Sequence, residues 1–215
     1  KEVGPDCASA VVIVNDYTVL AGTQGYFHHH KLDRAIAQAR QLKLPAVMYT
    51  EGGGGRPGDD DVKTQIAGLH LSSFRDLAAL GQWVPRITVN HGYCFAGNAA
   101  LFGAGDIRIA TRASWIGMAG PAMIEGGGLG RFDPTQIGPA EQQFKNGVVD
   151  ILVEDEAEAT AVAKQVLGYF QGAIAGVEPE FEAEILRDVI PQDRRWAYPV
   201  RQVIKGLCDK DSFCE

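Results

Sequence analysis

Apolar runs alternate with amphipathic stretches along most of the chain, which is typical of an α/β protein. The apolar runs predict strands at residues 10–15, 17–21, 46–50, 86–90, 106–110 and 148–153. The stretches between them carry apolar residues at helical spacing and predict helices at 31–42, 61–80, 96–103 and 154–169. In the first of these helices, Leu32, Ala35, Ile36 and Ala39 fall on one face. The pattern therefore predicts repeated strand-strand-helix units in an α/β fold.

Four consecutive glycines, Gly52 to Gly55, follow directly on the strand predicted at 46–50. Glycine adopts positive φ readily and lets bare N–H groups approach a ligand. A strand that runs into such a loop can present backbone donors to a developing negative charge. A flexible surface turn would have the same composition.

Two later segments favour the first interpretation. Residues 84–101 read as a strand, a small-residue turn and an alanine-rich helix that starts near Ala96 or Gly97. Gly120-Pro121 is a second helix entry, because proline is tolerated at the first helical position. Helix starts carry unpaired N–H groups, so these loops predict backbone donors gathered at one edge of the fold.

These loops also carry a resemblance to a known family. The segments are Glu-Gly-Gly-Gly-Gly-Arg at 51–56, His-Gly-Tyr-Cys-Phe-Ala-Gly-Asn-Ala-Ala at 91–100 and Ile-Gly-Met-Ala-Gly-Pro-Ala-Met-Ile-Glu at 116–125. Together with the segments at 21–25, 146–150 and 191–201, they make the chain resemble the N-terminal half of the carboxyltransferase of biotin-dependent acyl-CoA carboxylases.

The resemblance implies a crotonase-like (ClpP/crotonase) spiral, with residues 1–175 as the N-terminal half and residues 176–215 as a linker and the start of a second half. The implied reaction transfers carboxylate from carboxybiotin to the α-carbon of an acetyl-, propionyl- or longer acyl-CoA. In that family the ureido nitrogen of biotin removes the α-proton, so no side-chain base is required. The implied partners are a separate biotin carrier domain, a biotin carboxylase and further copies in a homo-oligomer, and no metal is expected.

The resemblance also implies roles for individual residues. The backbone amides implied to stabilise the enolate oxygen are those of Gly53, Gly54, Gly55, Ala96 and Gly97. Gly120 would close the pocket floor, and Arg56 and Lys31 would bind the phosphates of CoA. Relatives often have Gly-Gly-Ala where this chain has Ala96-Gly97-Asn98.

The family builds its site from two facing halves. The present chain alone is therefore expected to be poorly active or inactive. Trp196 and Tyr198, in the expected linker, should lie on an exposed surface or on a neighbouring chain.

Two other classes of function remain open from the sequence. In a crotonase-type hydratase or decarboxylase, Glu51 or Glu125 would act as acid or base. In a non-catalytic assembly domain, CoA binding would be lost. Arg56 has an alternative role too, because it could form an ion pair with Asp59 or Asp60.

Composition narrows these choices. The chain has 215 residues, of which 46% are hydrophobic and 22% charged, as in an ordinary globular protein. A net charge of −7 without a basic run disfavours nucleic acid or an anionic membrane as partner. No apolar stretch is long enough to span a bilayer and no signal peptide is visible, so we expect a cytoplasmic location.

Cysteine and histidine give no metal motif. The four cysteines form no Cys-x-x-Cys pair, so free thiols are expected. Cys94 precedes a predicted helix start that would lower the pKa of its thiol, which leaves a nucleophilic role open. His28, His29 and His30 are expected in a solvent-facing loop before the helix at 31–42.

Overall fold

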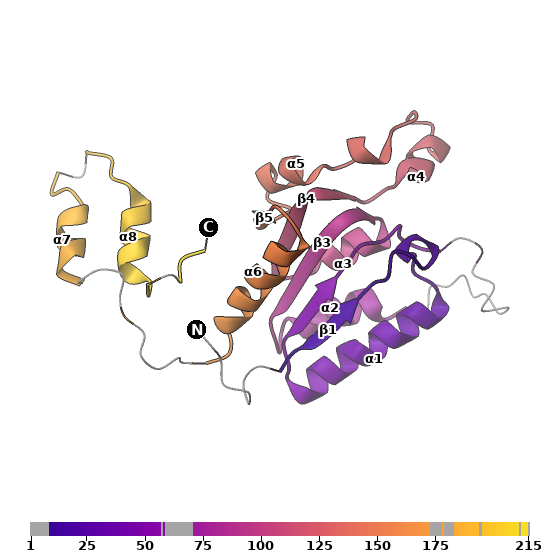
Figure 1. Ribbon diagram of the computed structural model, residues 1–215, viewed down its shortest axis with the longest axis horizontal. Helices are drawn as coiled ribbons and strands as arrows, with labels where there is room; N and C mark the ends of the chain where they lie inside the picture. Colours follow the sequence, from indigo (N-terminus) through magenta and orange to yellow (C-terminus); the bar gives the residue numbers. More distant parts are fainter. Residues whose placement is uncertain are drawn as a thin grey trace. The chain divides into compact units, whose positions relative to one another are not determined.

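The computed structural model describes residues 9–56, 58, 71–172, 178, 183–193, 195–210 and 212–214. It separates into two compact units, Lys1–Gln171 and Gly172–Glu215, which are described one at a time. The first unit contains a parallel sheet with the strand order β1-β2-β3-β4-β5 (Figure 1). The strands are β1 (Val11–Val14), β2 (Ala46–Tyr49), β3 (Arg86–Phe95), β4 (Ile107–Gly117) and β5 (Ile151–Val153).

Helices cover both faces of this sheet (Figure 1). On one face, α1 (Tyr26–Leu42), α2 (Ser73–Leu80) and α3 (Gly97–Gly103) enclose side chains such as Met48. On the other face, α6 (Glu156–Gly168) packs against Val47 and its neighbours. Adjacent residues of β2 are therefore buried on opposite faces, which explains why this strand reads as a continuous apolar run.

Three further helices of the first unit lie between β4 and β5 in the sequence. They are α4 (Pro121–Gly126), η3 (Pro134–Gln136) and α5 (Ala140–Lys145). Pro121 is the first residue of α4, so the helix entry predicted at Gly120-Pro121 is confirmed.

Most of the predicted elements are confirmed with shifted ends. The strands predicted at 46–50, 86–90, 106–110 and 148–153 correspond to β2, β3, β4 and β5. The helices predicted at 31–42, 96–103 and 154–169 correspond to α1, α3 and α6. Of the helix predicted at 61–80, the described residues contain α2, and residues 61–70 lie outside them.

The strand predicted at 17–21 is wrong, because this segment is a turn followed by the 3₁₀ helix η2 (Leu20–Gly22). The Oδ1 atom of Asp16 accepts hydrogen bonds from the N–H and the hydroxyl of Thr18, at 2.9 and 2.6 Å. This local turn chemistry overrides the β-propensity of the apolar run.

The predicted solvent-facing histidine loop is also wrong. Since α1 already starts at Tyr26, His28, His29 and His30 lie inside the helix. His29 is only 5% exposed, and its Nδ1 atom lies 2.9 Å from the Oγ atom of Ser73. The pairing with α2 is a tertiary contact that the local sequence does not reveal.

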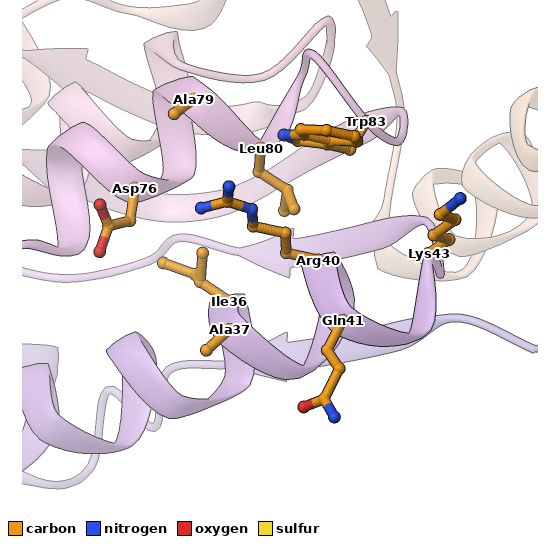
Figure 2. Close-up of a pocket in the computed structure, with 9 residues that line it drawn as sticks. All are labelled: Ile36, Ala37, Arg40, Gln41, Lys43, Asp76, Ala79, Leu80 and Trp83. Atoms are coloured by element: carbon orange, nitrogen blue, oxygen red, sulfur yellow. The ribbon is translucent and has the colours of Figure 1, made fainter.

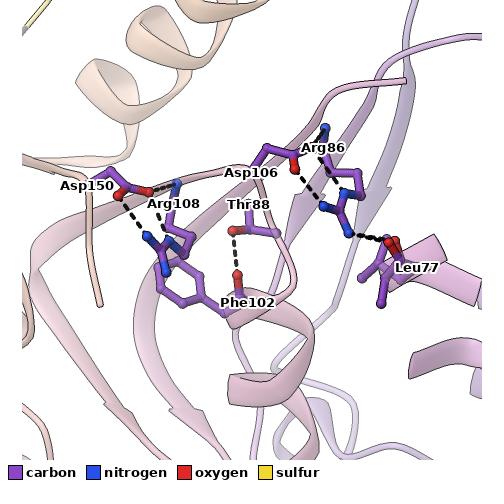
Figure 3. A network of polar contacts seen from close by, with 8 residues as sticks. Leu77, Arg86, Thr88, Phe102, Asp106, Arg108 and Asp150 are labelled. Atoms are coloured by element: carbon purple, nitrogen blue, oxygen red, sulfur yellow. Dashed lines mark hydrogen bonds and ion pairs between the residues drawn. The ribbon is translucent and has the colours of Figure 1, made fainter. Parts of the chain in front are cut away.

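Ion pairs repeat along the amino edge of the sheet, where the strands begin (Figure 3). Arg86 at the start of β3 pairs with Asp106, which directly precedes β4, at 2.5 Å. In the next strand, β4, Arg108 pairs with Asp150, which directly precedes β5, at 2.8 Å. Each aspartate also accepts a hydrogen bond from the backbone N–H of its arginine. The repeat therefore fixes where neighbouring strands start.

The second unit contains η4 (Ala183–Ile185), α7 (Leu186–Val189) and α8 (Val200–Leu207). Trp196 and Tyr198 are exposed, at 69% and 42%, as predicted for the linker. The predicted boundary between 175 and 176 lies outside the described residues and stays a prediction. Within the described part of the chain, every helix is too short or too polar to cross a bilayer.

Candidate active site

Loops that follow neighbouring strands meet at the carboxyl edge of the sheet, where the strands end. The glycine loop after β2 pairs with the segment after β1, because Gln24 N donates to Gly54 O at 2.7 Å and Arg56 N donates to Gln24 O at 2.9 Å. It also pairs with the end of β3, because Phe95 N donates to Gly52 O at 2.9 Å. The fold thus brings the predicted glycines next to the start of α3.

Asn98 in α3 holds these loops together from inside the protein. It is fully buried, and its Oδ1 atom accepts a hydrogen bond from Gly54 N at 2.9 Å. Its Nδ2 atom donates to Thr50 O at 3.0 Å, Glu51 O at 3.3 Å and Gly22 O at 3.4 Å. The hydrophobic pattern and the glycine motifs of the sequence do not point to a role for Asn98.

Three of the amides predicted to stabilise an oxyanion already have acceptors within the fold. Gly53 N donates to Ala21 O, and Ala96 N donates to Gly117 O, both at 2.9 Å. Gly54 N is bonded to Asn98. These residues therefore shape the edge in this structure, and their N–H groups are not available to a ligand.

Gly55 and Gly97 differ from these three. Within the described residues, neither of their N–H groups has an acceptor. Gly55 forms a parallel bridge with Gln24, and Gly97 is the first residue of α3. The two free donors of the predicted set thus come from two adjoining loops.

Ala96 has φ 51° and ψ −117°, a conformation that residues other than glycine rarely adopt. Such strain is characteristic of functional sites, where surrounding structure holds it in place. Gly120 lies beside the same turn, since a Cβ there would be 3.4 Å from the ring of Phe95.

The two predicted phosphate ligands line one cavity. Lys31 and Arg56 border a hollow of about 310 Å³ beside the glycine loop, together with Thr23 and His28. Arg56 donates from Nε to the hydroxyl of Thr23 at 3.2 Å and from Nη2 to the carbonyl oxygen of Thr23 at 3.0 Å. Asp59 and Asp60, its alternative partners, lie outside the described residues. Burial, helped by the positive charges of His29 and Arg56, lowers the pKa of His28 to about 4.

A second hollow of about 350 Å³ lies at the other edge, between the ends of α1 and α2 (Figure 2). Its rim includes Arg40, whose guanidinium carbon is 5.5 Å from the ring centroid of Trp83. None of the predicted site residues borders it, so its size alone does not make it the active site.

The other candidate residues have separate surroundings. Cys94 is completely buried, and burial raises the pKa of its thiol to about 12, which argues against a nucleophilic role.

Glu125 pairs with Arg131 at 2.6 Å, whereas the carboxylate of Glu51 lies against Gly92. Burial raises the pKa of Glu51. The two glutamates therefore have different neighbours. Among the described residues, no three His, Cys, Asp or Glu side chains are grouped to hold a metal.

Comparison with known proteins decides the family. The sequence matches the carboxyl transferase domain over residues 6–215. The chain belongs to this family. The carboxyl transferase domain is 28% identical to a probable biotin-dependent acyl-coenzyme A carboxylase beta2 subunit of Mycobacterium tuberculosis, over 99% of the chain and 41% of that protein. It is 26% identical to the methylmalonyl-CoA carboxyltransferase 12S subunit of Propionibacterium freudenreichii, over 93% of the chain and 39% of that protein.

Solved structures agree with this assignment. A single-chain, multi-domain long-chain acyl-CoA carboxylase is 49% identical, with a TM-score of 0.87 over 97% of this chain and 20% of that one. A transcarboxylase 12S structure has a TM-score of 0.71 at 24% identity and shows the fold alone. The predicted family and crotonase-like fold class are confirmed. The carboxyl transferase domain spans about two-fifths of the length of the curated relatives it matches.

Proposed function

We propose that this domain binds an acyl-CoA and stabilises its enolate during carboxyl transfer from biotin. The observation that carries the proposal is the pair of free N–H groups of Gly55 and Gly97, because Gly55 directly precedes Arg56, which lines the cavity together with Lys31. Fixed amides stabilise an oxyanion without having to reorganise, and two cations suit the phosphates of CoA.

The chemistry needs only one charged oxygen at this edge. When the α-proton leaves, its electron pair forms the enolate double bond and the negative charge moves to the thioester oxygen. The amides of Gly55 and Gly97 donate to that oxygen, while Gly53, Gly54 and Ala96 set the shape of the turn. The enolate carbon then forms a bond to the carbon of the released carbon dioxide, one C=O electron pair moves onto an oxygen of the new carboxylate, and the thioester C=O re-forms as the charge leaves its oxygen.

When bound, biotin supplies the carboxyl group and the base that takes the α-proton. An external base fits this domain, because Cys94 is buried, Glu125 is engaged by Arg131 and the carboxylate of Glu51 lies against Gly92. One set of amides serves one oxygen, so the ureido oxygen of biotin needs other donors. We assign these donors to the part of the carboxylase that corresponds to the rest of the relative's length, beyond the matched 41%. On this basis the isolated domain should be poorly active.

The proposed partners are an acyl-CoA, a biotin carrier, a biotin carboxylase and further copies of the chain. The name of one similar structure describes a hexamer, which supports self-association. Four apolar side chains in the segment after β4, those of Met118, Met123, Leu129 and Phe132, are exposed and could be covered by such a contact. In α3, by contrast, Leu101 and Phe102 are fully buried, so that helix serves the core. The cytoplasmic location stays a prediction.

The test uses the complete native protein with a carboxylated acyl-CoA and free biotin, which reverses the transfer and needs no biotin carboxylase. Formation of decarboxylated acyl-CoA that depends on biotin would support the proposal. Hydration of an enoyl-CoA without biotin would favour a hydratase, and failure to bind CoA would favour an assembly domain. Comparing acetyl-, propionyl- and long-chain thioesters in the forward direction would identify the substrate.

A further inference from the structure

Gln24 is a buried polar residue next to the two free amides. Only 5% of it is exposed, and its backbone is fixed to the glycine loop through Gly54 O and Arg56 N. It also forms a parallel bridge with Gly55. Its position is therefore set by the same hydrogen bonds that set the position of the proposed donor at Gly55.

The side chain of Gln24 extends to the second free amide. A Cβ atom at position 97 would overlap the Oε1 atom of Gln24, so the carboxamide lies directly against Gly97. Gly97 does not have a left-handed φ. Glycine at this position is thus explained by the space that Gln24 occupies.

The carboxamide has an unused donor. Its Nε2 atom is buried and has no hydrogen-bond partner among the described residues. Buried polar groups in folded proteins are nearly always paired, and an exception calls for an explanation. Nε2 lies 3.4 Å from the Cβ position of Gly97, so the unpaired donor is close to the second free amide, and the backbone bridge brings Gly55 to the same residue. A ligand oxygen bound at these amides would supply the missing acceptor.

We propose that Gln24 is a third, side-chain donor to the thioester oxygen of the bound acyl-CoA, acting together with the amides of Gly55 and Gly97. The proposal rests on the proposed function and deepens it. Nε2 would strengthen its hydrogen bond as the carbonyl oxygen becomes the enolate oxygen, so Gln24 would act mainly on the chemical step.

The test replaces Gln24 by methionine, which has similar length and no donor, in the complete native protein. Because one oxyanion donor is removed, kcat for carboxyl transfer should fall about 10²-fold while KM stays within about threefold. Thermal unfolding should occur at the same or a higher temperature, since an unpaired buried donor is lost. Gln24→Glu, which keeps the length and loses the donor when ionised, should also lose activity.

Gln41→Met is the matched control, because Gln41 is exposed near the end of α1 and borders the other hollow (Figure 2). It should keep the wild-type kcat. A wild-type kcat in Gln24→Met would overturn the assignment of Gln24 and leave the proposed function standing. A fall in kcat that only follows a fall in folded protein would show a structural role and would overturn it as well.

A binding readout separates the two proposals further. The infrared stretch of a ¹³C-labelled thioester carbonyl should shift to lower frequency on binding to wild-type protein, and less so on binding to Gln24→Met. Equal shifts in both proteins would contradict the role of Gln24. A wild-type protein that neither binds the thioester nor transfers carboxylate would remove both proposals.

Discussion

The two edges of the sheet differ in whether their polar groups are paired within the protein. At the amino edge, Arg86 and Arg108 each donate to an aspartate that directly precedes the next strand. At the carboxyl edge, the N–H groups of Gly55 and Gly97 have no acceptor among the described residues. One edge is built from long charged side chains in matched pairs, and the other from glycines and backbone.

This difference separates stability from function. The two ion pairs link β3 to β4 and β4 to β5, and in each pair the charges of the arginine and the aspartate neutralise one another. At the carboxyl edge, Asn98 fixes the glycine loop through its hydrogen bond with Gly54 N, and Ala96 has a strained backbone conformation. Substitutions at the amino edge should therefore change stability and spare activity, whereas those at the carboxyl edge should change activity first.

The largest effect on activity is expected from Gly54→Val in the complete protein. Gly54 has φ 91°, and a Cβ there would be 2.7 Å from the Cβ of Ala96 and 3.1 Å from Phe95 O. Valine should displace the turn and lower carboxyl transfer to below about 1% of wild type, with the fold largely retained. Activity assays with circular dichroism measure both. Gly103→Ala, at an open position in the last turn of α3, is the control. Near-normal turnover in Gly54→Val would contradict the site.

The sequence predicts this edge better than it predicts what supports the edge. Glycine runs after apolar strands are local signals, so the loop at 52–55 and the entry at Gly120 could be placed. The supports are tertiary contacts. Asn98 bonds to Gly54 across 44 positions, and His29 lies against Ser73 across the same separation.

The backbone donors show the same limit. The sequence names five amides, but whether an amide is free depends on distant carbonyl groups. Gly53 N is taken by Ala21 O because residues 17–21 form a turn instead of the predicted strand. Turn conformation there could not be derived from hydrophobic pattern.

Asn98→Ala should affect both stability and activity. It leaves Gly54 N without an acceptor and removes the donor to Thr50 O, so we expect a loss of about 3 kcal/mol in the free energy of unfolding. Looser positioning of the glycine loop should lower kcat about tenfold. Urea unfolding and turnover at saturating substrate measure the two effects. Asn146→Ala, which changes an exposed asparagine, should change neither. An unaltered kcat in Asn98→Ala would show that the asparagine stabilises the fold without positioning the loop.

Arg86→Met should affect stability alone. The Arg86 side chain is 13% exposed, and besides Asp106 it donates to the carbonyl oxygens of Leu77 and Ala78 at the end of α2. Leaving these acceptors unpaired should cost about 2 kcal/mol, with kcat unchanged. Arg75→Met is the matched control, because the pair of Arg75 with Asp76 is exposed and contributes little. A fall in kcat of folded Arg86→Met would link the two edges and weaken the comparison.

The smallest effects should come from pH, and they should separate the edges by their titration ranges. At the amino edge, burial raises the pKa of Asp106, but the hydrogen bonds from Arg86 outweigh it and hold this pKa below 3.8. The stability that this aspartate contributes is therefore present above pH 3.8 and is lost as the pH falls through the folded-state pKa. Asp106→Asn should therefore lower the free energy of unfolding at neutral pH and lower it less in strong acid.

At the carboxyl edge, His28 should act at higher pH. Its pKa is lowered from 6.5 to about 4 by burial and by the neighbouring positive charges, so the unfolded chain binds its proton first as the pH falls. Its contribution is thus complete above pH 6.5 and is lost between 6.5 and about 4. The full pKa shift corresponds to about 3 kcal/mol, which solvent around the partly exposed ring reduces to about 1 kcal/mol. In His28→Gln, the free energy of unfolding measured with urea should therefore depend less on pH across this range. Asp106→Asn should leave the slope there intact, because Asp106 titrates below it. An unchanged slope in His28→Gln would show that another group at the carboxyl edge takes up the proton.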